Sequence, residues 1–289
     1  MTTAAETILE TAAVEHRRGF RRRWYRTPSF VAGLSILGLI TLLGALAPVI
    51  TWHDPTTQDL LAAFQGPSLS HPLGTDDLGR DVLTRLLHAA RTDLQIAFLA
   101  VIIPFVIGTA VGLLAGYFGG RVDTIANWFV SVFVAFPFYV LIIAFVFVLG
   151  SGTRNIYIAI ALVGWVSYTR IVRGEVLVTK RREYVLAAQA AGLSTVRILR
   201  RHVLPNVITQ AIVYAMSDIV LSILAIVTLG YLGLGVQPPT PDWGRMIADG
   251  QPYLTTNWEL STIPGLAIIF TALGLALLAD GVADLLRPE

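Results

Sequence analysis

The stretch LQIAFLAVIIPFVIGTAVGLLAGYFGG, residues 94–120, carries no charged side chain. A helix needs about 20 apolar residues to cross the ~30 Å hydrocarbon layer of a membrane, so this stretch is long enough to span it. Gly108, Gly112, Gly116 and Gly120 recur at every fourth position and therefore share one helix face. Glycine on that face lets a neighbouring backbone approach closely, which is how membrane helices gain packing contacts. We therefore expect a transmembrane helix that lies centrally in a bundle.

Other charge-free stretches indicate more spans. Residues 30–50, 124–153 and 260–279 are each long enough to cross, 207–229 is interrupted only by Asp218, and 155–169 has only 15 residues. By its length, the last stretch could be re-entrant instead. The composition agrees, since 55% of the residues are hydrophobic and 14% charged, against about 25% charged in soluble domains. We predict an all-α membrane protein with six transmembrane helices, and no disulfides because the chain has no cysteine.

The positions of the basic residues predict the orientation of the spans. With six spans and the N-terminus inside, 16 of the 21 basic residues lie on the inner side and five on the outer side. This agrees with the excess of Lys and Arg in cytoplasmic loops. Eight of the 16 lie from Arg170 to Arg201, and they would all lie outside if residues 155–169 did not cross. We therefore count 155–169 as a span and place both termini in the cytoplasm.

The predicted organisation follows from these spans. A cytoplasmic Arg-rich N-terminus at 1–29 precedes a first transmembrane helix at 30–50, an outer loop at 51–93, a five-helix membrane domain at 94–280 with an inner loop at 170–206, and a cytoplasmic C-terminus at 281–289. Arginines before an apolar run are also typical of a signal peptide. The run has 21 residues, however, and exceeds the usual 7–15 residue core. We therefore expect an uncleaved first span.

The outer loop combines a polar motif with an amphipathic stretch. The motif HPLGTDDLGRD occupies residues 71–81, and Val82, Leu86, Ala90 and Leu94 then recur every four residues. That spacing predicts an apolar stripe on a helix. Such a helix could lie at the outer membrane surface and run into the second span.

Histidine and carboxylates in this motif raise the alternative of a metal site. His71, Asp76, Asp77 and Asp81 all carry groups of the kind that ligate metals. We favour the interpretation that Thr75, Asp76 and Asp77 cap the following helix, because one histidine alone makes a weak metal site. No metal-binding residue is therefore predicted.

Asp218 is the one acid inside a predicted span. Ionisable residues within a membrane are functional candidates because their burial is costly, and a secondary carrier would use such a group for proton transfer. We favour a structural hydrogen bond, because no basic partner accompanies Asp218 in the membrane. An intramembrane enzyme is not indicated, since all five histidines lie outside the apolar stretches.

The inner loop at 170–206 carries the most specific pattern. Good helix formers run from Glu183 to Ala191, and Gly192 is predicted to end that helix. Ser194 can cap a second short helix, after which Leu204-Pro205-Asn206 is expected to turn the chain into the fifth span. Two short helices would make a compact projection whose small alanine side chains let a partner protein pack closely. A plain surface hairpin is the alternative.

Five segments, taken together and in order, resemble the membrane permease subunits of ATP-driven importers of the peptide/nickel class. The resemblance is greatest to the C-type permeases of dipeptide and oligopeptide systems. The segments are HPLGTD with LGRD at 71–81, GYFGG at 116–120, EYV followed by two alanines and Gly192 at 183–192, RHVLPN at 201–206 and LGLGVQPP at 232–239. The resemblance covers nearly the whole chain.

The resemblance implies a type I ABC importer permease fold with a cytoplasmic coupling-helix loop, in the bacterial cytoplasmic (inner) membrane. Its implied partners are a homologous second permease subunit, two cytoplasmic ATPase subunits, an extracytoplasmic solute-binding protein and membrane lipid, with no nucleic acid. This chain has no phosphate-binding loop, since its only lysine, Lys180, is followed by Arg181. No catalytic residue or cofactor is therefore expected here, and ATP and Mg²⁺ would bind to the partner ATPases.

The resemblance also implies three groups of site residues. The ATPase-coupling loop holds Glu183, Ala187, Ala188, Gly192, Leu204 and Pro205; the translocation path or gate holds Asp218, Leu232, Gly233, Leu234 and Gly235; the binding-protein contact holds Pro238, Pro239 and Trp243. Two positions depart from the family pattern. Leu186 replaces a usual Glu, which removes a carboxylate from the docking loop, and Ile226 replaces a frequent acid of the path.

The substrate class is the least determined inference. Peptides are the expected cargo, and nickel, opines, glutathione-like conjugates and oligosaccharides are alternatives. Selectivity in such systems resembles a property of the binding protein, so this subunit does not distinguish among them.

Overall fold

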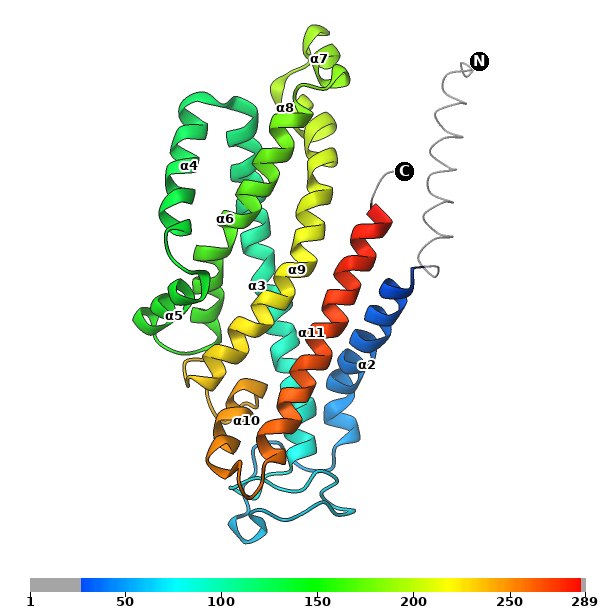
Figure 1. Ribbon diagram of the computed structural model, residues 1–289, viewed down its shortest axis with the longest axis vertical. Coiled ribbons are helices and arrows are strands. Elements are labelled where there is room, and N and C mark those ends of the chain that lie inside the picture. Colours follow the sequence, from blue (N-terminus) through cyan, green and yellow to red (C-terminus); the bar gives the residue numbers. More distant parts are fainter. Residues whose placement is uncertain (1–26, 287–289) are drawn as a thin grey trace.

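The computed structural model describes residues 27–286, and within that range it consists of helices, loops and one isolated β-bridge (Figure 1). The long helices are α2 (Pro28–Ile50), α3 (Val82–Phe118), α6 (Thr153–Thr179), α9 (Leu204–Tyr231) and α11 (Glu259–Leu286). The shorter ones are α4 (Gly120–Val134), α5 (Phe138–Leu149), α7 (Glu183–Ala190), α8 (Thr195–Ile198), α10 (Trp243–Gly250), η2 (Leu60–Ala62), η3 (Leu199–Val203) and η4 (Gln251–Tyr253). The predicted Arg-rich segment before residue 27 and Arg287 lie outside the described residues.

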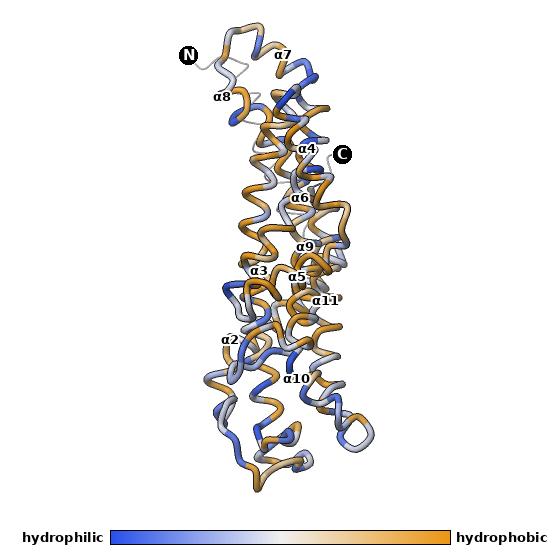
Figure 2. The backbone as a smooth tube through the Cα atoms, turned by 90° about the vertical axis from the view of Figure 1, so that its left-hand side faces the viewer, coloured by the Kyte–Doolittle hydropathy of each residue, from blue (hydrophilic) through white to orange (hydrophobic). Residues whose placement is uncertain are grey.

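The helices form an elongated bundle with two different ends (Figure 1). One end carries α7 and the other carries α10 with the loop 51–81; we call them the α7 end and the α10 end. Five helices are long and apolar enough to cross a membrane, and the α4–α5 pair makes six if it counts as one broken span. Hydrophobic residues dominate the middle of the bundle, and hydrophilic residues gather toward its ends (Figure 2). The all-α membrane fold is therefore confirmed.

The third predicted span, 124–153, is not one straight helix. It breaks between α4 and α5, whose axes meet at 86°. The break spans residues 135–137, and Pro137 lies immediately before α5. Proline lacks an N–H and disfavours a helical conformation of the residue before it, here Phe136. Hydrophobicity alone could not show this bend, because both arms are apolar.

The fourth span is much longer than residues 155–169. Helix α6 has 27 residues and continues past Arg170 and Arg173 to Thr179. The charge-free criterion ended the span too early, since Arg173 pairs with Asp123 of α4 and is accommodated on the helix. The re-entrant alternative for 155–169 is therefore wrong, and the inner loop is correspondingly shorter than predicted.

Glycine packing joins α3 to α6, as the spacing of the glycines predicts. A Cβ added to Gly112 would lie 2.7 Å from the Thr169 carbonyl oxygen, and one added to Gly116 would lie 2.8 Å from Val176 Cβ. Gly108 likewise faces the α6 backbone, where its carbonyl accepts a hydrogen bond from Thr169 Oγ1 at 3.2 Å. Gly120 does not take part, because it has a φ of +52° and begins α4.

This contact predicts a sharp difference between two glycines. Gly112→Ala should destabilise the protein, because its methyl group would meet α6 backbone and overpacking of this kind costs about 1–3 kcal/mol. The matched control is Gly174→Ala on α6, where no atom lies within 4 Å of the added carbon. That substitution should be neutral or slightly stabilising, since alanine is the better helix former by about 1 kcal/mol. Thermal unfolding of the purified protein compares the two, and equal melting temperatures would contradict the packing role.

Candidate functional site

The α7 projection, residues 180–203, extends beyond the other helices at the α7 end (Figure 1). It is held between α6, which leads into it, and α9, which follows it. Lys180 at the end of α6 donates to the Gly116 carbonyl oxygen at 2.7 Å, which ties the base of the projection to α3. The projection is therefore attached to the bundle through long helices on both sides.

Gly192 ends α7 as predicted, through a specific cap. Its φ is +73°, a left-handed conformation that glycine adopts without strain. The Gly192 N–H donates to the Gln189 carbonyl at 3.0 Å, and the Leu193 N–H donates to the Ala188 carbonyl at 3.2 Å. These two bonds are the Schellman pattern, which satisfies carbonyls left free at a helix end. The cap fixes the direction in which the chain leaves α7.

The predicted coupling residues fall on two different faces of α7. Glu183, Ala187 and Gly192 are exposed, and so is Leu186, which is 49% accessible. Ala188 is only 6% accessible and packs inward with Val185. Ala188 is therefore not an accessible docking contact, in contrast to the expectation that all the alanines present a small-residue surface. The helical period places Ala187 and Ala188 about 100° apart, so one faces outward and the other inward.

The chain does not turn at Leu204-Pro205-Asn206, and this expectation is wrong. The helix from Thr195 continues through to Tyr231. Its segment η3 is a π-helix that ends immediately before Leu204, and Pro205 lies in the first turn of α9. Proline cannot donate to the carbonyl four residues earlier and its ring crowds that carbonyl, so a wider turn accommodates it. Ser194 occupies the N-cap position of α8, but its side chain makes no capping hydrogen bond.

Asp218 lies on α9 in the interior of the bundle and is 3% accessible. Tyr168 of α6 donates its hydroxyl proton to Asp218 Oδ2 at 2.9 Å. The Tyr168 ring packs edge-on against Tyr214, with centroids 4.8 Å apart. Asp218 is thus a hydrogen-bonded acid between two helices, which agrees with the structural interpretation made from the sequence.

A polar cavity that the sequence did not indicate lies between α4 and α6. Its volume is about 340 Å³, and its polar lining comes from Asn127, Ser131, Thr169, Arg170 and Arg173. These residues are some 40 positions apart in sequence. Without the contact between α4 and α6, no pattern could have grouped them.

The segment after α9 is a surface loop with a buried end. Leu232 and Gly233 are exposed, Leu234 is half-buried and Gly235 is buried. The adjacent prolines, Pro238 and Pro239, are exposed. This loop therefore presents its middle to the surroundings at the α10 end.

Trp243 is not accessible to a binding protein, in contrast to the prediction from the sequence. It is 1% accessible, and its indole N–H donates to the Leu86 carbonyl at 3.1 Å. It fills a small core with Val82 and Met246, which also covers the apolar stripe at the start of α3. Trp258, in the same loop region as Trp243, is exposed instead, at 60%. The sequence could not separate the two, because both are aromatic residues in a polar loop.

Asp76 and Asp77 of the 71–81 motif do not cap the following helix, although the sequence pattern predicted that they would. Asp81, and not Thr75, Asp76 or Asp77, caps α3, since its Oδ2 accepts from the Thr84 N–H at 2.7 Å. Asp76 pairs with Arg80 at 2.7 Å within the motif. Burial is the main cause that raises the pKa of Asp77 above its usual value. His71 and Asp81 approach each other at 3.0 Å, whereas Asp76 and Asp77 face Arg80 instead.

Two family models match this chain, one over its N-terminal segment and one over most of the rest. Residues 108–289 match the family model "Binding-protein-dependent transport system inner membrane component", and residues 17–67 match "N-terminal TM domain of oligopeptide transport permease C". The first match contains the α7 projection, the α3 glycines that pack against α6, and α10, and it covers more than half of the chain.

Curated relatives span nearly the same length. The chain is 37% identical over 259 residues to the dipeptide transport system permease protein DppC of Alkalihalophilus pseudofirmus, covering 90% of this chain and 85% of the relative. It is 38% identical over 260 residues to the oligopeptide transport system permease protein OppC of Bacillus subtilis, with coverage of 90% and 85%. It is 37% identical over 273 residues to the glutathione transport system permease protein GsiD of Pectobacterium atrosepticum, with coverage of 94% and 91%.

Solved structures support the fold. A chain of the MetNI methionine ABC transporter in an inward-facing conformation has a TM-score of 0.54 and 18% identity, covering 70% of this chain and 97% of that one. A chain of an amino acid ABC transporter has a TM-score of 0.53 and 15% identity, covering 68% and 91%. Together with the family match, these similarities show that the chain belongs to the family of binding-protein-dependent transport system inner membrane components.

Proposed function

We propose that this chain is a permease subunit of an ATP-driven importer that moves dipeptides or oligopeptides across the bacterial cytoplasmic membrane. The observation that carries the proposal is the α7 projection, a capped helix that extends past the bundle with one exposed face. The dipeptide and oligopeptide permeases to which the chain is similar support the choice of cargo. The α7 end then lies in the cytoplasm, as the basic residues of the inner loop indicate.

The exposed face of α7 docks a cytoplasmic ATPase subunit. Glu183 and Ala187 are on that face, and Gly192 fixes the exit of the chain. The absent carboxylate at Leu186 makes the contact one of shape more than of charge. Because α7 is joined to α6 on one side and to a continuous helix of 37 residues on the other, a push on it moves two membrane helices. Leu204 and Pro205 lie in the first turn of α9, which is part of that continuous helix.

Other subunits supply the remaining functions. Two ATPases hold ATP and Mg²⁺, a homologous permease completes the translocation path, and a solute-binding protein delivers the cargo at the α10 end. Pro238, Pro239 and Trp258 are the exposed contacts proposed for that delivery, with Trp258 taking the place predicted for Trp243. The Leu232–Gly235 loop at the end of α9 is the proposed gate, because α9 connects it directly with the projection.

The cargo is tested best with the whole assembly. The reconstituted complex with its binding protein should show ATPase activity stimulated by peptides from a library. Nickel chelates and glutathione serve as the competing substrates, the second because GsiD is also similar to this chain. Stimulation by nickel chelates alone would replace the peptide proposal and leave the permease role in place.

The coupling role predicts the effect of Gly192→Val. Valine strains a φ of +73°, at a cost of about 1–2 kcal/mol, so the α7 cap should distort although no atom lies within 4 Å. Peptide uptake should fall and ATP hydrolysis should lose its dependence on peptide. Gly66→Val is the control, since Gly66 is also exposed with open space but has no positive φ. Unchanged peptide-stimulated ATPase activity in Gly192→Val would contradict the docking assignment.

The hydrogen bond of Asp218 predicts two different outcomes. Asp218→Asn keeps an oxygen that can accept from Tyr168, so peptide uptake should remain largely intact. Tyr168→Phe leaves the buried carboxylate without this donor and should lower the stability by about 1–3 kcal/mol. Uptake and thermal unfolding are measured on the same preparations. Complete loss of uptake in a normally assembled Asp218→Asn complex would favour proton transfer by this residue.

A further inference from the structure

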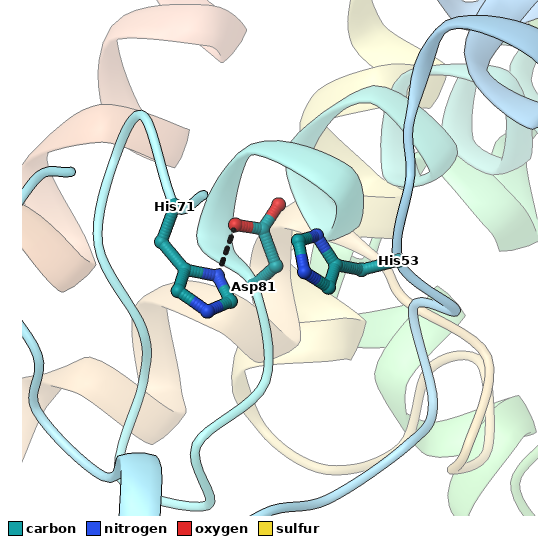
Figure 3. A group of neighbouring side chains, drawn as sticks. All are labelled: His53, His71 and Asp81. Atoms are coloured by element: carbon teal, nitrogen blue, oxygen red, sulfur yellow. Dashed lines mark hydrogen bonds and ion pairs between the residues drawn. The ribbon is translucent and has the colours of Figure 1, made fainter. Parts of the chain in front are cut away.

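Two histidines and one aspartate meet at the α10 end, outside the apolar helices (Figure 3). His53 lies just after α2, His71 opens the 71–81 motif, and Asp81 caps α3. Each offers one ligand atom, and these three atoms all lie within 4.8 Å of one another. The sequence pointed to His71 and Asp81 but supplied no second histidine, because His53 lies 18 residues earlier in the chain.

Hydrogen bonds hold two of the three side chains in place. The His71 ring donates from Nδ1 to Asp81 Oδ1 at 3.0 Å, and Asp81 Oδ2 accepts from the Thr84 N–H at 2.7 Å. The His71 backbone is held as well, since its N–H donates to Ser68 Oγ at 3.0 Å. The Asp81 side chain is 2% accessible and that of His71 15%. These contacts hold the His71 ring beside the Asp81 carboxylate, with both ligand groups already next to each other.

His53 supplies the third group and is otherwise uncommitted. Its ring stacks on that of His71, with centroids 4.5 Å apart and planes inclined by 29°. Among residues 27–286, no side chain or backbone group forms a hydrogen bond with the His53 ring. Figure 3 shows the three side chains grouped together, with a dashed line joining His71 to Asp81. An imidazole without a protein partner, beside a second imidazole and a carboxylate, is free to bind a cation.

The neighbouring acids are excluded from such a site because arginines already bind them. Asp76 pairs with Arg80 at 2.7 Å and lies 3.5 Å from Arg85, and Asp77 faces Arg80 at 3.7 Å. Asp81 is the acid of the motif whose side chain faces a histidine. The ligand set is therefore His53, His71 and Asp81, and it differs from the set of one histidine and three aspartates considered from the sequence.

We propose that His53, His71 and Asp81 bind a divalent transition-metal ion, with Zn²⁺ as the best fit. Two imidazoles and a carboxylate suit Zn²⁺ and leave a fourth position for water. Ligands about 2.0–2.2 Å from a tetrahedral ion lie roughly 3.3 Å apart, so the widest pair must close by about 1.5 Å, within the reach of side-chain rotation. The bound ion joins the end of α2 to the start of α3 and so fixes the fold of the loop 51–81.

The experiment is a Zn²⁺ titration of the metal-free full complex in detergent, by calorimetry, with Co²⁺ as a spectroscopic probe. His53→Gln is the main variant, because that ring makes no hydrogen bond that its loss could disturb. His88→Gln is the control, since His88 lies at the same end but its Nδ1 is 2.9 Å from the Thr84 carbonyl oxygen. His53→Gln should remove one site per chain or weaken it at least about tenfold, and should abolish the visible absorption of bound Co²⁺. His88→Gln should leave both unchanged.

A second measurement separates binding from folding. Zn²⁺ should raise the melting temperature of the wild-type complex but not that of His53→Gln, because only an ion bound to the folded loop stabilises it. His71→Gln should also lose the site, although it breaks the bond to Asp81 as well. Equal Zn²⁺ stoichiometry and affinity in the wild type and in His53→Gln, or the absence of Zn²⁺ binding to the wild type, would overturn the proposal.

Discussion

The close approach of α3 and α6 is the contact on which the rest of the bundle depends. Lipid tails are as apolar as leucine, so helices in a membrane gain little from burying apolar surface against each other and must gain from packing instead. Gly108, Gly112 and Gly116 remove side chains where the α6 backbone passes. Because α6 leads directly into the α7 projection, this contact also fixes the base of the part proposed to bind the ATPase.

Ion pairs help to hold the α10 end together. Arg80 lies between Asp76 at 2.7 Å and Asp249 of α10 at 3.5 Å, and Arg85 lies 3.9 Å from the same Asp249. The loop before α3 is thereby joined to α10. Removing either partner of such a buried pair would leave the other charge unpaired, which is strongly destabilising, so each residue depends on its partner. The proposed metal ion would add a second link, from α2 to α3.

One continuous helix runs from the α7 end of the bundle toward the α10 end. From the projection, the chain runs without a break from Thr195 to Tyr231 and then enters the proposed gate. The π-helix η3 and Pro205 are toward one end of this helix, and Gly233, whose φ is +75° and whose N–H donates to the Gly230 carbonyl at 3.0 Å, follows the other end. A continuous helix with a π-helical turn near the projection is a physical basis for the proposed transmission of motion from ATPase subunits across the membrane.

The sequence by itself determined the membrane class, the long apolar helices, the close-packing face of residues 108–116 and the helix stop at Gly192. Those features depend on local composition or on the period of one helix, so each is visible in a short stretch of sequence. Only the tertiary structure decided the bend at Pro137, the length of α6, the burial of Ala188 and Trp243, and the meeting of His53 with His71. These outcomes depend on which distant segments pack together: Arg173 continues a helix because Asp123 is opposite it, and Trp243 is buried because α3 covers it.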